Sequence, residues 1–334
     1  YALNLKGDAP AQGKMDISVV NIEENAGQVP VNYVLPPGVT RIIDPGQSQI
    51  TQLNEQAMSL KVTDLQSGDA RAVYKNSGMD MRTYKRLQMF VHAEKLIDDK
   101  TNLRDGDVSV FLRLGSDSKS NYYEYEVPLS LTEPGNYSTY NAQDQEAVWP
   151  QSNMFDFPLS LFTDLKLERN AKKRMDNSTV TFQTRYSSYD PDKNQNKVTI
   201  VGNPSLSDVR TMMIGVRNNS NAAKDIVVWV NEMRLTDFDQ SGGWAAKANV
   251  NLGLSDIATL NIAGHVETVG FGGIDQSLTE RRLDDYYQYN IATMVELGRF
   301  LPEKVKLKAP LFYSITEQRT SPKYNPLDQD ILLK

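Results

Sequence analysis

The sequence predicts an all-β protein, in which a soluble antiparallel β-sandwich is followed by strands of a membrane-spanning β-barrel. Three observations lead to this prediction. Apolar and polar residues alternate with the two-residue period of a strand in many short runs. Clusters of Gly, Pro, Asn and Asp separate these runs, as turns separate strands. The last four runs have the length of a strand that crosses a bilayer at a tilt.

Composition excludes several classes of protein. The 334 residues are 40% hydrophobic and 23% charged, which is typical of a folded chain long enough for two or more structural units. The net charge of −6 argues against a nucleic-acid partner, because such proteins usually present a basic face. With no Cys and only two His, the chain lacks a His-rich metal site. No run of 18 apolar residues exists, which excludes a membrane-spanning helix.

Residues 1–80 are expected to form a linker with short strands that leads from a preceding part of the barrel. Two strands are predicted there, over Met15–Ile22 and Ala57–Val62. The chain begins at Tyr1 without a leader and stops at Lys334 within an apolar pattern, so we expect a fragment of a longer protein.

Residues 81–240 are expected to form the sandwich as a soluble domain. One helix is predicted from Pro158, at a first-turn position, to Arg169. The strands predicted around it cover residues 87–93, 108–114, 123–127, 179–185, 198–201, 209–216 and 226–235.

Residues 241–334 are expected to form transmembrane strands with loops. In each of the four runs one face is apolar with Tyr near the ends, and the other carries Lys, Asn, Glu or His. This suits a strand with lipid on one side and water on the other. An ordinary half-buried antiparallel sheet shows the same alternation, so the pattern alone leaves both interpretations open. The runs cover residues 246–254, 258–267, 287–297 and 305–313.

The connections between these runs predict an orientation. They are short around Asp256 and from Gly298 to Glu303, but long and Gly-rich from Thr268 to Asp285. Outer-membrane barrels have short periplasmic turns and long outer loops. We therefore expect Ser255 and Leu301 at the periplasmic end, and the sandwich, which precedes the first run, on the extracellular side.

No catalytic or cofactor motif is apparent, and we expect no enzyme activity. Asp190, Asp192 and Asn194 have the spacing of a calcium loop, but Gln195 and Val201 stand where that loop needs Gly and Glu, so a solvated turn is favoured. A strand Trp such as Trp229 is expected in the core rather than on a sugar-stacking surface. A secreted glycoside hydrolase is a third possible class, and it would need two carboxylates that face each other across a cleft. The sequence gives no reason to choose any such pair.

Several strings, in order along the chain from about residue 30, resemble one family. The string VWVNEMRLTDFD at 228–239, followed by GGWAA at 242–246, resembles the SprA/Sov family of Bacteroidetes. The other matching strings are VNYVLPPG at 31–38, QLNEQ at 52–56, GNPSLSD at 202–208, IGVRN at 214–218, GFGGIDQ at 270–276, ELGR at 296–299 and PKYNPLDQD at 322–330.

The resemblance implies a segment of a very large outer-membrane β-barrel, with the jelly-roll-like sandwich inserted as a cap. Such proteins form the protein-conducting pore of the type IX secretion system, which serves protein export and gliding motility. The implied partners are the remainder of the barrel, a PorV-like barrel protein, a periplasmic plug protein, exported cargo and membrane lipid or lipopolysaccharide. No catalytic, cofactor or metal residues carry over. The residues expected to line the hydrated lumen are Lys247, Asn249, Asn251, His265, Glu267 and Lys306.

A different class of function remains open on the sequence. Residues 81–240 could instead form a cell-surface carbohydrate-binding β-sandwich with exposed aromatic side chains. That alternative predicts sugar affinity in the sandwich but gives no reason for four runs of membrane length.

Overall fold

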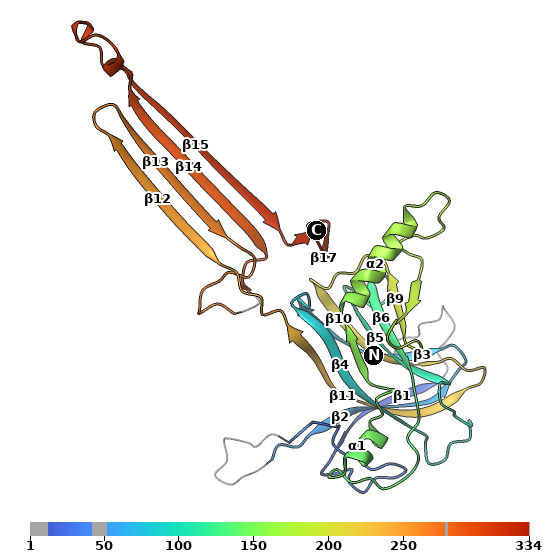
Figure 1. Ribbon diagram of the computed structural model, residues 1–334. Coiled ribbons are helices and arrows are strands. Elements are labelled where there is room, and N and C mark those ends of the chain that lie inside the picture. Colours follow the sequence, from blue (N-terminus) through green and yellow to red (C-terminus); the bar gives the residue numbers. More distant parts are fainter. Residues whose placement is uncertain (1–12, 42–51, 278–279, 334) are drawn as a thin grey trace. The chain divides into compact units, whose positions relative to one another are not determined.

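The computed structural model describes residues 13–41, 52–277 and 280–333, and nearly all of its regular structure is antiparallel strand (Figure 1). The chain divides into two compact units, Tyr1–Phe238 and Asp239–Lys334. An all-β fold is thereby confirmed.

The first unit is a two-layer β-sandwich. One layer is a five-stranded sheet in the order β1-β2-β11-β4-β7 and the other a six-stranded sheet in the order β3-β10-β5-β6-β9-β8. The strands of the five-stranded sheet are β1 (Lys14–Asn21), β2 (Gln56–Leu65), β4 (Tyr84–Glu94), β7 (Phe155–Pro158) and β11 (Lys224–Phe238). Those of the six-stranded sheet are β3 (Ala70–Met79), β5 (Val108–Gly115), β6 (Tyr122–Pro128), β8 (Tyr186–Tyr189), β9 (Lys197–Val201) and β10 (Val209–Asn218).

The main core fills the space between these sheets. Each strand places every second side chain toward it, because successive residues of a strand point to opposite faces. Val62 and Val91 come from one sheet and Val110 and Tyr125 from the other, and all four are buried in one cluster. Helix α2 (Ser160–Lys173) adds Phe162, whose ring stacks on that of Tyr123 with centroids 4.9 Å apart.

A second core covers the opposite face of the five-stranded sheet. Trp229 of β11 and Phe90 of β4 pack there with Tyr33 and Trp149, and all four are buried. Trp149 follows the short helix α1 (Ala142–Val148), and its Nε1–H donates to the carbonyl of Val34 at 2.9 Å. Loop segments thus lie over a strand face that alternation alone would leave in water.

Four expectations for this unit were wrong in detail. Residues 14–21, 56–65 and 70–79 are not part of a linker: they are β1, β2 and β3 of the sandwich sheets, while residues 1–12 and 42–51 lie outside the described residues. No strand covers residues 179–185; the strand is β8, which begins one residue later.

The helix begins at Ser160, since Pro158 ends β7. Helix α1 was not predicted, because its seven residues carry no helical apolar stripe; Asn141 caps it by accepting from the backbone N–H of Gln143.

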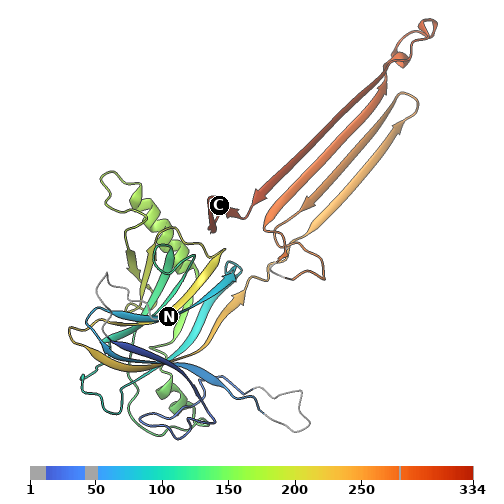
Figure 2. The same cartoon turned by 180° about the vertical axis from the view of Figure 1, so that it is seen from behind.

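The second unit is a four-stranded antiparallel sheet followed by a two-stranded hairpin. The sheet is a simple meander, β12-β13-β14-β15, in which each strand pairs with the next (Figures 1 and 2). Its strands are β12 (Ala245–Leu254), β13 (Ala258–Glu267), β14 (Asp284–Glu296) and β15 (Pro310–Pro322), and the hairpin is β16 (Tyr324–Asn325) with β17 (Asp328–Leu332).

The last membrane-length run was placed too early. Residues 303–305 form a turn of 3-10 helix, and Lys306 has a φ of 47°, so the chain cannot run as a strand from Val305. The strand begins at Pro310. Proline has no backbone N–H to donate to a neighbouring strand, and at the first position of a strand this does not interrupt the ladder of backbone hydrogen bonds. The connection at this end therefore spans residues 297–309 and is not the short turn that was expected.

Candidate functional site

The two faces of the four-stranded sheet differ in chemistry, and the strand register decides which side chains share a face. A row of aliphatic side chains crosses all four strands: Val250 pairs with Ile262, Ile262 with Ile291, and Ile291 with Ile315. One step along the strands, on the opposite face, Asn251 pairs with Asn261. In the middle of the sheet one face is thus apolar and the other polar, while toward the 268–283 loop the apolar face also carries Asp285, Glu317 and Arg319.

The polar face holds five of the six residues expected to line a lumen. Lys247, Asn249 and Asn251 alternate along β12, and His265 and Glu267 lie on β13. Lys247 pairs directly with His265, so these residues share a face. Whether that face meets a lumen stays a prediction. The sixth residue is placed differently.

Lys306 does not lie on the polar face. It belongs to the connection 297–309, beyond the end of the sheet, where it helps to line a hollow with Asp256 and Arg299. The expected alternation through Lys304, Lys306 and Lys308 fails because this segment is not a strand.

Charged groups of the polar face form a network toward the end that carries the 268–283 loop. Glu267 is its centre: Oε1 lies 3.0 Å from His265 Nε2, and Oε2 accepts from Arg282 Nη1 at 2.6 Å. Arg282 also donates through Nε to Asp284 at 3.1 Å. The guanidinium lies over the Tyr286 ring at 5.1 Å. A fixed group of paired charges therefore stands at one end of a surface of amides and hydroxyls.

Neutral groups, most of them polar, occupy the rest of this face, with Met294 and Phe312 at the end nearer Ser255. Asn261 donates to the side-chain oxygen of Asn251, and Asn290 Nδ2 donates to Thr316 Oγ1 at 2.6 Å. Tyr286 donates to Gln288 Oε1 at 2.8 Å. Side-chain amides and hydroxyls that bond one another across strands form a wettable surface without a strong net charge.

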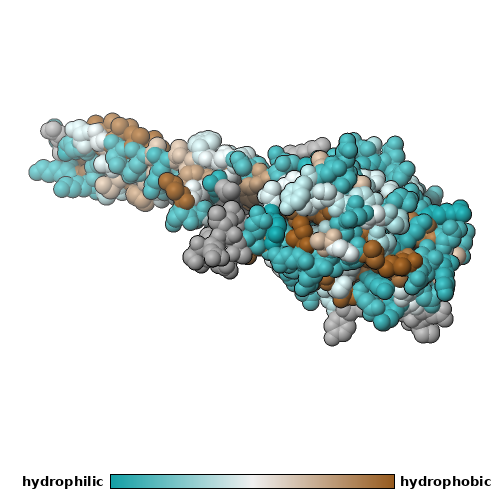
Figure 3. Space-filling view, turned by 90° about the horizontal axis from the view of Figure 1, so that it is seen from below, coloured by the Kyte–Doolittle hydropathy of each residue, from teal (hydrophilic) through white to brown (hydrophobic). Residues whose placement is uncertain are grey.

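The apolar face is exposed to the surroundings in the structure. Val250 is 48% exposed, Leu252 47% and Leu311 51%, although a sheet face in water normally packs on a core. Tyr287, Tyr289 and Tyr313 lie on the same face, toward the strand ends. Figure 3 shows apolar side chains at the surface of this sheet, in the narrow part of the view at left.

The sheet is also open at both sides. Among the described residues β12 and β15 each have one paired neighbour, so each leaves one row of backbone N–H and C=O groups free. The four strands do not close into a barrel by themselves.

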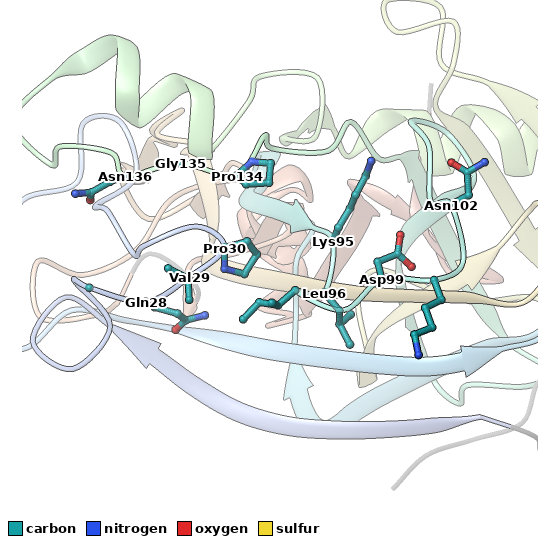
Figure 4. Close-up of a pocket in the computed structure, with 13 residues that line it drawn as sticks. Gln28, Val29, Pro30, Lys95, Leu96, Asp99, Asn102, Pro134, Gly135 and Asn136 are labelled. Carbon is teal, nitrogen blue, oxygen red and sulfur yellow. The ribbon is translucent and has the colours of Figure 1, made fainter.

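The sandwich carries a separate hollow of about 1010 Å³ between three loops (Figure 4). Lys95, Asp99 and Asn102 come from the segment after β4, and Pro30 and Pro134 from two other loops. The Asp99 carboxylate is already hydrogen-bonded within its own loop. It accepts from the Thr101 N–H and hydroxyl and from the Leu103 N–H. These bonds hold the pKa of Asp99 below its ordinary value, although partial burial opposes them. In the part of the chain that the structure describes, the residues lining this hollow include no Ser, Thr or His.

The expected solvated turn at Asp190 is a turn anchored in the core. Asp190 is buried, and its carboxylate accepts from the Tyr125 hydroxyl at 2.6 Å and from the Asp192 N–H at 2.9 Å. Burial and this acceptor raise the pKa of Tyr125. Both carboxylate oxygens of Asp190 are therefore hydrogen-bonded within the protein. Within the described part of the chain, no group of three or more His, Asp or Glu residues could hold a metal ion.

Trp229 lies in the second core, as expected for a strand Trp, and Trp149 beside it is also buried. The two indoles are therefore unavailable for stacking on a sugar. No helix among the described residues has both the length and the apolar character that crossing a membrane requires.

Comparison with known families gives a match. The sequence matches the family model SprA_N, described as motility related/secretion protein, over residues 1–334. Comparison with curated proteins finds no match.

Proposed function

The chain belongs to the SprA_N family of motility related/secretion proteins, and on that premise we propose that its four-stranded sheet is part of the wall of an outer-membrane protein-conducting pore. The pore is that of the type IX secretion system, which exports proteins and serves gliding motility. The role is structural and non-catalytic: the sheet separates lipid from a hydrated lumen.

The observation that carries this proposal is the exposed apolar face. Val250, Leu252 and Leu311 are each about half exposed on one side of a sheet whose other side carries Asn and Gln residues. Leaving such a face in water is costly, at roughly 25 cal/mol per Å² of apolar surface. Lipid removes that cost, and the strands have the length that a bilayer needs.

The open edges support a larger assembly. Unpaired backbone groups in hydrocarbon cost several kcal/mol each, so an open sheet is not stable in lipid. We propose that β12 and β15 pair with further strands of the remaining barrel. A PorV-like barrel, a periplasmic plug protein, exported cargo and outer-membrane lipid or lipopolysaccharide are the other partners that the proposal includes.

We propose that the end of the sheet at Ser255 faces the periplasm and that the sandwich lies outside the cell. The tight turn at Ser255–Ile257 and the long loop 268–283 lie at opposite ends of the sheet, which supports this orientation. The 297–309 connection lies at the same end of the sheet as Ser255 but is longer than a periplasmic turn usually is. It therefore gives less support to this orientation than the turn at Ser255–Ile257 does. Protease added to intact cells should cleave the sandwich; sparing of residues 13–238 would place it inside.

The wall assignment is tested by labelling single cysteines in native outer membranes. These 334 residues contain no Cys, so each substitution introduces one thiol into them. We expect Asn251→Cys and Asn261→Cys to react with a charged, membrane-impermeant maleimide. Val250→Cys and Ile262→Cys should react only with a lipid-soluble maleimide, because their side chains face hydrocarbon.

The two faces are matched, since Val250 and Asn251 are adjacent on β12 and Asn261 and Ile262 are adjacent on β13. Solubilisation in detergent should make the apolar-face thiols reactive toward the charged reagent as well. Equal labelling of both faces in the intact membrane would show that both are in water, and the wall proposal would be rejected.

A further inference from the structure

The outer face of the six-stranded sheet carries a hollow that has no part in the proposed pore wall. We call it the arginine hollow; its volume is about 410 Å³, within the range of small-ligand sites. The strand neighbours of its residues, such as Val216, Val110 and Val198, point into the main core, so the hollow opens on the opposite face of the sheet. Its lining residues include Glu126, Arg185, Tyr189, Gln195, Lys197, Arg217 and Asn219.

Ion pairs beneath the hollow hold its cations in place. Glu124 is fully buried and accepts from Arg113 Nε, from Arg185 Nη2 and from Arg217 Nη2, the last at 3.1 Å. Arg217 Nη1 also donates to Glu126, and its guanidinium lies 4.7 Å from the centre of the Phe111 ring. Guanidinium groups held on several sides lose little entropy when they bind a ligand.

The hollow is positively charged in a chain that is negative overall. Three cations, Arg185, Lys197 and Arg217, line it against one carboxylate, Glu126. The pair of Arg113 and Glu124 beneath it cancels. An excess of two positive charges thus stands on one face of a chain whose net charge is −6. Such an excess attracts an anion.

Uncharged groups at the rim indicate what carries the anion. Tyr189 is 63% exposed, which leaves its ring face available for stacking. The exposed amides of Gln195 and Asn219 add hydrogen-bond donors and acceptors, although Asn219 Nδ2 already donates one hydrogen bond to Ser109 Oγ at 2.9 Å. An aromatic face beside planar amides matches a sugar ring, which has an apolar C–H face and a rim of hydroxyls.

We propose that the arginine hollow binds an oligosaccharide that bears carboxylate groups, such as a uronic acid chain. An extended acidic peptide fits less well. Peptides that bind sheets do so along an edge, through free backbone groups. Most of the hollow lies over β10, β5, β6 and β9, whose backbone groups are paired on both sides, so side chains must recognise a ligand there; of the strands around the hollow only β8, which supplies Tyr189 at the rim, is at an edge of the sheet.

The test is calorimetric titration of the full chain in detergent with a galacturonic acid hexamer. A neutral galactose hexamer tests the need for charge, and a glutamate hexapeptide tests the need for sugar. We expect the galacturonic acid hexamer to bind at least tenfold more tightly than either of the others. Tyr189→Ala and Lys197→Gln should each weaken its binding by about tenfold.

Tyr140→Ala and Lys61→Gln are matched controls, because both residues are exposed and lie away from the hollow. They should leave binding unchanged, and all four variants should keep the parent's melting temperature. The proposal is overturned if the acidic hexamer fails to bind, if either comparison ligand binds equally, or if the hollow variants bind like the controls. These binding results do not depend on whether the four-stranded sheet forms a pore wall, because no residue of that sheet lines the arginine hollow.

Discussion

Glu124 is the residue whose surroundings differ most from those that strand alternation suggests. It lies on the outer face of β6, yet it is fully buried under Arg113, Arg185 and Arg217. Burial by itself would raise the pKa of Glu124, but the three guanidinium groups outweigh it and hold the pKa below its ordinary value. Its charge therefore stabilises the folded state.

We expect Glu124→Gln to destabilise the sandwich by about 3–5 kcal/mol at neutral pH, because it removes the shared partner of buried guanidinium groups. Urea unfolding of residues 1–238, followed by circular dichroism, measures this. Glu133→Gln, at an exposed loop position, is the control and should change stability by less than about 0.5 kcal/mol. A loss of similar size in both variants would contradict the network's role.

Acid should weaken the same network. Because the folded-state pKa is lowered, the stabilisation is fully present above the pKa of an unfolded glutamate, about 4.3. It is lost as pH falls through the lower folded-state pKa. We expect Glu124→Gln to flatten the fall in unfolding free energy below pH 4.3. If the variant and the parent lose stability in parallel, another carboxylate is responsible.

Gly215 shows how closely the outer face of the six-stranded sheet is packed. A Cβ added there would lie 2.3 Å from Phe111 Cζ and 2.7 Å from Ala72 Cβ. We expect Gly215→Ala to cost about 1–3 kcal/mol through overpacking. Gly78→Ala, on the adjacent strand β3 with no atom within 4 Å of the added Cβ, should be nearly neutral in the same unfolding measurement.

At the scale of the element, strand β12 shows what the alternation means. All ten of its residues are exposed, so neither face packs on protein within its unit. Adjacent positions nevertheless differ in chemistry: Val250 lies in the aliphatic row and Asn251 in the polar row. Two substitutions one residue apart therefore test two different environments.

We expect Val250→Lys to reduce assembly into the outer membrane sharply, because a cation on the lipid face near mid-bilayer costs about 2–4 kcal/mol. Asn251→Lys should assemble almost normally, since the polar face meets water in the proposed pore. The measurement is the amount of heat-modifiable, protease-resistant protein in outer-membrane fractions. Equal tolerance of the two lysines would mean that β12 does not separate lipid from water.

At the scale of the whole molecule, the two units differ in how they are stabilised. The sandwich has a continuous core between its sheets and a second core outside one of them. In the second unit, β12 and β15 are exposed along their entire length, and the free edges remain unpaired among the described residues. Such a sheet needs a partner for its apolar face and further strands at its edges to be stable.

We therefore expect residues 1–238 alone to be a soluble, cooperatively unfolding monomer. Residues 239–334 alone should aggregate in water and form strands only in detergent or lipid. Size-exclusion chromatography and circular dichroism of the two fragments distinguish these behaviours. A monomeric, folded second fragment in plain buffer would contradict the lipid-facing assignment.

At the junction of the units, Asp239 shows a contact that only the folded chain reveals. Its carboxylate accepts from the Ser241 hydroxyl at 2.7 Å and from Lys323 Nζ at 3.0 Å, which holds the pKa of Asp239 to about 2. The start of the second unit is thereby tied to the residue after β15. Nothing in the spacing of Asp239 and Lys323 along the chain indicates this pair.

The sequence alone was sufficient for the all-β class, for most strand positions and for the two faces of β12, β13 and β14. These features depend on side chains alternating every two residues within one strand, which is a local property. The same alternation placed Lys247, Asn251 and His265 on one face.

Tertiary structure alone decided the rest. The strands of residues 14–79 joined the sandwich, β15 began at Pro310 rather than near Val305, and Lys306 left the polar face. The second core around Trp229 and the ion pairs around Glu124 join residues that lie far apart in the chain. Such contacts depend on which strands become neighbours, and the period of a single strand carries no information about its neighbours.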